Sequence, residues 1–133
     1  MTSLNPVTPA RILLTLNALI LSTAPFIADW NHTHIYNPRW PPHAKFHNGQ
    51  TMSMAVCLSF LSLYYSWISD ALGNESDAIK VAAVVGGVYC VTGLSAIWYP
   101  GSKAIDPEFG RGFPQFWPWV AHLVVCAWAW WLS

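Results

Sequence analysis

The sequence predicts an all-α integral membrane protein, an antiparallel four-helix bundle with two long polar connections on one membrane face. Hydrophobic residues make up 54% of the 133 residues and charged residues only 9%, whereas a soluble domain carries about 25% charged residues. The mean hydropathy is +0.35. The apolar residues fall into four segments, and backbone inside lipid must satisfy its own hydrogen bonds, as helices do.

The apolar segments lie at about residues 9–28, 50–72, 78–98 and 117–132. A spanning helix needs about 20 apolar residues, with roughly 17 at the short end, so the first three fit and the fourth is marginal. The first segment has no basic stretch before it, which argues against a cleaved signal peptide. We therefore expect one multi-pass domain over residues 1–133, in the endoplasmic reticulum membrane.

Small residues recur at helical spacing within three of these segments, which lets helices approach closely in a membrane. They are Ala55, Ser59, Ser62, Ser66 and Ser69 in the second segment, Ala82, Ala83, Gly86, Cys90 and Gly93 in the third, and Thr15, Ala18 and Ser22 in the first. The sequence leaves open whether such faces form the bundle core or a homodimer. Cys57, Cys90 and Cys126 lie singly in apolar stretches and are expected to be buried packing residues.

An even number of crossings places both termini on one face with the turn at residues 73–77, where Asp70, Glu75 and Asp77 are expected to be solvated. The connections at about 29–49 and 99–115 then share the opposite face. That face holds four of the six basic residues, Arg39, Lys45, Lys103 and Arg111, against Arg11 and Lys80. The positive-inside rule therefore places the long connections in the cytoplasm. A neutral chain with six Lys and Arg residues offers no basic patch for nucleic acid.

Most titratable side chains gather at the face with the long connections. They are His32, His34, His43 and His47 in the first connection, His122 one turn inside the last span, and the acids Asp29, Asp106 and Glu108. Rigid prolines and amphipathic rings interleave with them, which differs from a flexible linker. The second connection is punctuated by Gly and Pro, as in a lid. In extended backbone its two acids would face the same way. We expect a pocket at this mouth of the bundle.

A metal site is a weaker interpretation of the same residues. His32-x-His34 and His43-x3-His47 are spacings that can hold one ion, and Asp29 or Asp106 could complete the set. However, the chain has no tight signature such as HExxH. We therefore expect no cofactor, and a metal ion remains the alternative.

Other chemistries find less support. The chain has no nucleophile-elbow motif, no Asp, Glu, Lys or Arg at mid-depth of a span and no inverted repeat. The polar residues inside the spans are expected either to bond across helices or to line the deep end of a pocket. They are Asn17, Tyr64, Tyr65, Tyr89 and Thr92.

Residues 29–47, DWNHTHIYNPRWPPHAKFH, carry a specific resemblance. They resemble the D-x-N-x-T-H-x-x-N-P-x-W-P-P-H-A-x-F-H loop of a group of small fungal four-span membrane proteins. Some members belong to polyketide mycotoxin pathways of the aurovertin and citreoviridin type, where they act as epoxide hydrolases or cyclases that form oxygen heterocycles. The loop covers about a seventh of the chain. The resemblance implies a lipophilic epoxide substrate, membrane lipid as surroundings and a pathway monooxygenase as partner.

Epoxide opening needs an acid at the departing oxygen and a base for the nucleophile, and two groups in different environments can divide these tasks. We assign the pair to Asp29 with Asp106 or Glu108, and His43 and His47 are the alternative acid or base. Substrate contacts are assigned to Asn31, His34, Arg39, Trp30, Trp40, Trp117, His122 and Tyr64. The tryptophans are included because their ring faces stabilise developing positive charge.

Three rival functions remain open. The first is a metal-dependent membrane oxidase or hydrolase that uses the same histidines. The second is a non-catalytic bundle that binds lipid or sterol, or an assembly subunit of a larger enzyme. The third is an isomerase that applies the same acid–base chemistry to an alkene.

Overall fold

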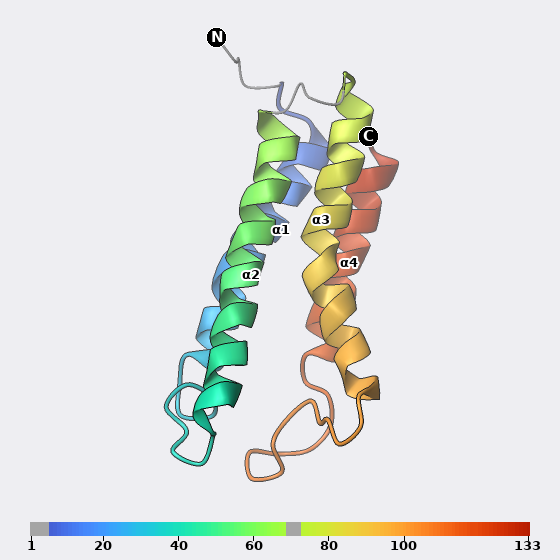
Figure 1. The fold of residues 1–133 in the computed structure, drawn as a ribbon. Helices are drawn as coiled ribbons and strands as arrows, with labels where there is room; N and C mark the ends of the chain where they lie inside the picture. The colour runs from blue at the N-terminus through green and yellow to red at the C-terminus, as the bar shows by residue number, and fades with distance from the viewer. Residues whose placement is uncertain (1–5, 69–72) are drawn as a thin grey trace.

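The computed structural model describes residues 6–68 and 73–133, which form four helices: α1 (Pro9–Asp29), α2 (Pro42–Trp67), α3 (Glu75–Ser95) and α4 (Phe116–Trp131). A short 3₁₀ turn, η1 (Ala96–Trp98), follows α3. Consecutive helices run antiparallel and pack on one another, and α1 also packs on α4, which closes the bundle (Figure 1). The predicted all-α four-helix bundle is confirmed.

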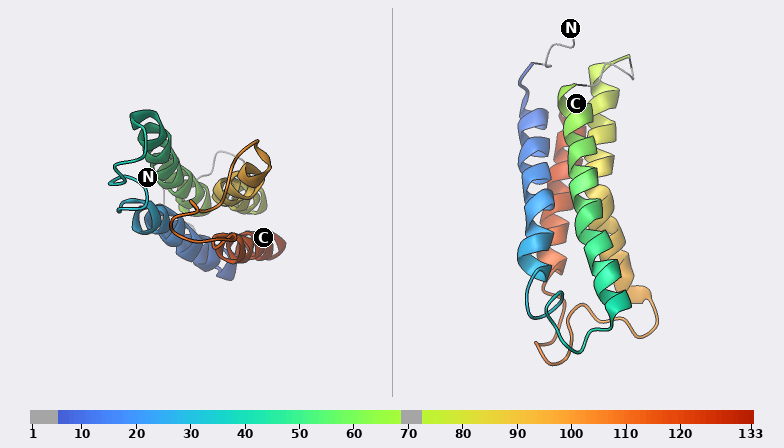
Figure 2. Two further views of the ribbon diagram at one scale, coloured as in Figure 1. Left: turned by 90° about the horizontal axis from the view of Figure 1, so that it is seen from below. Right: turned by 60° about the vertical axis from the view of Figure 1, so that its left-hand side comes forward.

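The start of α1 and the end of α4 lie at one end of the bundle, and both long connections lie at the other (Figures 1 and 2). We call these the terminal end and the connection end. The expected grouping of the two connections at one end is therefore present in the fold. It brings residues 30–41 close in space to residues 99–115.

Helix α2 begins at Pro42, rather than near residue 50 as the hydropathy suggested. Proline suits the first helical position, where its missing N–H is not needed and its fixed φ is already helical. The polar residues that follow continue the helix beyond the apolar stretch, so His43 and His47 lie on a helix and not in a connection. The predicted end of this span, with Ser69 and Asp70, lies outside the described residues.

The small-residue faces of α2 and α3 are buried largely as predicted. Ala55, Ser59, Ser62 and Ser66 are buried on α2, and Ala82, Ala83, Gly86 and Cys90 on α3, while Gly93 is half-buried. The predicted face of α1 was wrong in part, because Thr15 and Ser22 are only half-buried. Its buried face instead follows Leu14, Asn17, Ala18 and Leu21.

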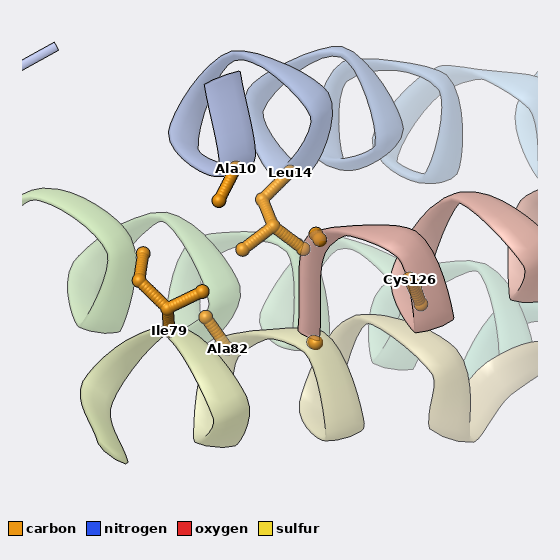
Figure 3. Close-up of a cluster of buried hydrophobic side chains, with 7 residues drawn as sticks. Ala10, Leu14, Ile79, Ala82 and Cys126 are labelled. Carbon is orange, nitrogen blue, oxygen red and sulfur yellow. The ribbon is translucent and has the colours of Figure 1, made fainter. Parts of the chain in front are cut away.

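The core is made mostly of small side chains from α1, α3 and α4, with Leu14 and Ile79 as its larger members (Figure 3). It comprises Ala10, Leu14, Ile79, Ala82, Ala83, Cys126 and Ala129. Many large apolar side chains point outward instead, among them Ile20, Phe60, Val84 and Val124. Cys57 is exposed, which corrects the expectation that all three cysteines are buried, and all three are free.

Two helical stretches, Pro9–Asp29 and Glu75–Trp98, are long and apolar enough to cross a membrane. In each, 28% of the most apolar window is buried inside the bundle, so most of it faces outward. Helix α4 has 16 residues, which gives a length of about 24 Å at 1.5 Å per residue.

A buried arginine ties three segments together at the terminal end. Arg11 is fully buried, and its Nε donates to Ser66 O at 2.6 Å. Its Nη1 donates to Glu75 Oε1 at 2.7 Å and to Pro6 O at 2.5 Å. Glu75 is therefore more than the solvated turn residue that we expected, because it balances the charge of a buried guanidinium.

Candidate functional site

The two connections lie at the same end of the bundle (Figure 2), and side chains of the first contact the second. Trp40 Nε1 donates to Asp106 Oδ2 at 3.0 Å. Asn37 Nδ2 donates to Glu108 Oε1 at 3.3 Å, and Arg39 forms an ion pair with the same carboxylate. The first connection therefore reaches both acids of the second.

A cavity of about 340 Å³ lies between the connections and the end of α1. Ligand pockets typically have volumes of about 300–1,000 Å³, so this cavity can hold part or all of a small organic molecule. Its polar or charged lining residues are Asp29, Thr33, His34, Lys103, Asp106 and Gln115, and its other lining residues are Ala28, Trp40, Ala104, Ile105 and Phe109.

Asp29 is the last residue of α1, and its carboxylate has two polar neighbours. Oδ2 accepts a hydrogen bond from Asn48 Nδ2 at 2.7 Å. Oδ1 lies 3.7 Å from His34 Nε2, and the two side chains are 19% and 31% exposed. The imidazole also packs edge-on against Trp40, with ring centroids 4.7 Å apart. Asp29 and His34 therefore form a half-buried acid–imidazole pair beside the cavity.

The hydrogen bonds behind His34 fix the role of each ring nitrogen. Asn31 Nδ2 donates to Ala28 O at 2.6 Å, so Asn31 Oδ1 is the acceptor of the Thr33 hydroxyl at 2.6 Å. That hydroxyl proton is then used, and its oxygen must accept from His34 Nδ1 at 2.6 Å. Nε2, beside Asp29, is the nitrogen left to gain or lose a proton.

Asp106 supplies the second carboxylate of the cavity. One of its oxygens accepts the Trp40 indole N–H, which leaves the other oxygen with acceptor capacity. The segment is a turn, in which Phe109 N donates to Asp106 O at 2.9 Å, and not the extended backbone that we expected. Glu108 does not line this cavity, because Arg39 and Asn37 hold it.

A second, more apolar cavity of about 180 Å³ adjoins the first. It lies against α3 and α4 and is lined in part by Gly93, Ile97, Phe113 and Trp119. Lys103, Ala104 and Gln115 line both cavities.

Gln115 lies where the two cavities meet. Its Nε2 donates to Ala104 O at 2.8 Å, which fixes the orientation of the amide. Its Oε1 is buried and has no hydrogen-bond partner among the described residues, and a buried acceptor of this kind is costly unless a ligand or water satisfies it.

Several predicted site residues lie away from the cavities. His43 and His47 are exposed on α2, with their Nε2 atoms 3.0 Å apart. Trp30 donates to Tyr36 Oη at 2.6 Å on the surface. Trp117 and Tyr64 are exposed, and Tyr64 lies in the last turns of α2, towards the terminal end.

His122 is placed in the bundle interior rather than at the mouth. It is buried, and Nε2 donates to Gly86 O at 3.0 Å, while its backbone carbonyl accepts from Asn17 Nδ2 at 3.1 Å. This side chain therefore joins α3 to α4. Asn31 and Arg39 do not line the cavity themselves. Asn31 orients Thr33, and Arg39 holds Glu108.

Sequence reasoning missed four residues that contact the site, namely Thr33, Asn48, Lys103 and Gln115. Thr33 and Asn48 lie in or directly after the polar stretch around the histidines, so their position was a usable signal. Lys103 entered only as a charge that sets orientation. Nothing local in the sequence marks Gln115, because its role depends on how the second connection folds.

Among the described residues, no group of three or more His, Cys, Asp and Glu side chains is placed to hold one metal ion. The two histidine pairs are separated, because His32 packs edge-on against Phe109 while His43 and His47 lie on α2. The two histidine pairs therefore do not share one centre.

Comparison with known proteins gives one family. Residues 13–130 match a family of unknown function, DUF6640. No curated protein and no solved structure matches the chain.

Proposed function

The chain belongs to the DUF6640 family, and we propose that it is a membrane-embedded epoxide hydrolase or cyclase for lipophilic, polyketide-type substrates. The observation that carries the proposal is the 340 Å³ cavity, which has the Asp29–His34 pair and Asp106 in its lining. The resemblance of residues 29–47 to the epoxide-opening fungal proteins supports the same chemistry.

The acid role is assigned to the Asp29–His34 pair. With Nδ1 bound to Thr33, a proton on His34 Nε2 gives an imidazolium that Asp29 stabilises. That proton moves to the epoxide oxygen as the C–O bond breaks, so the departing oxygen leaves as a hydroxyl. His34 is then neutral.

The base role is assigned to the free oxygen of Asp106. It takes the proton of the attacking water or hydroxyl as the new C–O bond forms. The proton then returns from Asp106 to His34 through solvent in the cavity, which restores both groups. With water the product is a diol, and with a hydroxyl of the same substrate it is an oxygen heterocycle formed without any other reactant.

Gln115 and the second cavity support the cyclase reaction. The unpartnered Gln115 Oε1 offers an acceptor for a substrate hydroxyl at the junction of the cavities. The apolar cavity against Gly93 and Trp119 suits the hydrocarbon part. Ring size would follow from how these two contacts fold the substrate before attack.

We further propose that the four helices span the endoplasmic reticulum membrane, with the connection end in the cytoplasm. Two helical stretches are apolar and long enough, and large apolar side chains point outward from α1, α2, α3 and α4. Exposed apolar surface of this extent is costly in water and favourable in lipid. A lipophilic epoxide dissolved in the bilayer could then reach the cavity from the membrane.

The test is turnover of lipophilic epoxides, with and without an internal hydroxyl, by the protein in membranes. We expect Asp29→Asn, His34→Gln and Asp106→Asn to reduce turnover about 10²- to 10⁴-fold, the usual value of a general acid or base. Glu108→Gln should cost much less, because Glu108 does not line the cavity. Asp77→Asn at the terminal end is the matched control for a carboxylate change.

Full turnover in all three cavity variants would refute the assignment, and full turnover in Asp106→Asn together with a loss in Glu108→Gln would make Glu108 the base instead. Complete loss of wild-type turnover in a chelator would favour the metal-dependent oxidase or hydrolase instead. An isomerase would convert alkenes and leave epoxides unchanged. Saturable binding of lipid or sterol without turnover would favour the non-catalytic bundle.

A further inference from the structure

His43 and His47 form a side-chain pair that the proposed chemistry does not use. They lie four residues apart on α2 and therefore on one face of the helix. Their Nε2 atoms are 3.0 Å apart, so that without an ion one ring donates a hydrogen bond to the other, and their ring centroids are 4.5 Å apart. Both side chains are exposed, and neither lines a cavity described above.

Gln50 determines which nitrogen of His47 carries the hydrogen. His47 Nδ1 lies 3.2 Å from Gln50 Oε1, which can only accept, so Nδ1 donates and Nε2 of the neutral ring keeps its lone pair. Metal-binding histidines are commonly oriented by a hydrogen bond from the other ring nitrogen. Phe46 packs against both rings, which restricts their rotation.

From this geometry we infer that His43 and His47 bind one divalent transition-metal ion, Cu(II) or Zn(II), at the start of α2. Two Nε2 ligands at about 2.0–2.1 Å from one ion would lie roughly 2.9–3.4 Å apart in square or tetrahedral geometry. The observed separation of 3.0 Å falls in this range. Water would fill the remaining positions, because the described residues offer no third ligand.

This ion would stiffen α2 rather than take part in epoxide opening. Pro41 gives the helix no side-chain cap, so its first turns depend on other contacts. The pair lies between Trp40 and Asn48, which contact Asp106 and Asp29. A bridge from His43 to His47 would hold this stretch in helical form.

The test is Cu(II) titration of protein without a polyhistidine tag, followed by calorimetry and electron paramagnetic resonance. A Cys57→Ser background removes the exposed thiol, which also binds copper. We expect one ion bound through two nitrogen ligands, since two rings on one helix bind as a chelate. His43→Ala and His47→Ala should each weaken binding about 100-fold or more, because each leaves a single ligand.

His32→Ala is the matched control, because His32 is an exposed histidine at the same end that packs on Phe109 and not on a second imidazole. It should leave copper affinity and the two-nitrogen spectrum unchanged. Unchanged affinity in His43→Ala and His47→Ala, or an equal loss in His32→Ala, would overturn the inference. His43→Ala and His47→Ala should keep the circular dichroism spectrum of the parent, which shows that they fold. The result is read from copper binding and does not require turnover.

Discussion

At the terminal end, Arg11 is fully buried and donates to Pro6, Ser66 and Glu75. At the connection end, Asp29 and Asp106 lie beside a cavity of about 340 Å³. The first end uses a buried charge to join three backbone segments. The second end holds its charges next to space that a ligand can enter.

The difference also appears in the hydrogen bonds that each end leaves unmade. Two of the three buried side-chain atoms without a partner in the described residues are at the connection end, Asn48 Oδ1 and Gln115 Oε1. The third is Arg11 Nη2. The terminal end therefore leaves one such atom unpaired and the connection end leaves two, one of which, Gln115 Oε1, belongs to a residue that lines both cavities.

The largest stability effect is expected from Arg11→Met. Ser66 O is one of the last carbonyls of α2, which have no partner within the helix. Removing the guanidinium leaves that carbonyl and Pro6 O without their donor and breaks the pair with Glu75. We expect a loss of about 2–4 kcal/mol in the free energy of unfolding, because Glu75 is half exposed and can be rehydrated.

Unfolding by denaturing detergent, followed by circular dichroism, measures this loss. Lys80→Met is the control, since Lys80 has only a 4.0 Å contact with Asp77 on the surface. If Arg39→Met at the connection end costs as much as Arg11→Met, the contrast between the ends is wrong.

A smaller effect is expected from Gly93→Ala, beside the second cavity. A Cβ at this position would lie 2.7–3.0 Å from ring atoms of Trp119, so the indole must move. Overpacking of this kind costs about 1–3 kcal/mol, and the displaced ring alters the apolar cavity. We expect lower stability and reduced turnover or binding of long apolar substrates, measured against short ones.

Gly49→Ala is the matched control, because nothing lies within 4 Å of a Cβ there and the residue is inside α2. It should stabilise the protein by about 0.5–1 kcal/mol. If Gly93→Ala leaves the preference between long and short substrates unchanged, the second cavity does not bind the substrate.

The sequence predicted the bundle well because hydropathy and small-residue spacing are local signals. The face of α2 from Ala55 to Ser66 is buried as its spacing indicated. The predicted start of α2 was wrong, because the residues that follow Pro42 are polar and yet belong to the helix. Hydropathy therefore marks the part of a helix that lies in apolar surroundings, and it does not mark polar turns that extend the same helix.

The site was less predictable because its contacts cross between connections. The spacing of Asp106 and Glu108 could group the two acids. It could not show that Asp106 accepts a hydrogen bond from Trp40 while Glu108 pairs with Arg39. Arg11 gave no sign of burial, because its partners Ser66 and Glu75 are distant in sequence. Such pairings depend on the tertiary fold.

The smallest effect is expected from the ion pair that joins the two connections. The Arg39 side chain is 69% exposed and that of Glu108 is 30% exposed, and such pairs contribute about 0.2–1 kcal/mol. Arg39→Glu and Glu108→Arg should each raise KM severalfold with little change in unfolding, because the connections then repel each other over the cavity. The double exchange should restore KM, since it restores the attraction. Failure of the exchange, with both single variants impaired, would mean that Asn37 Nδ2, which donates to Glu108 at 3.3 Å, requires a carboxylate at that position.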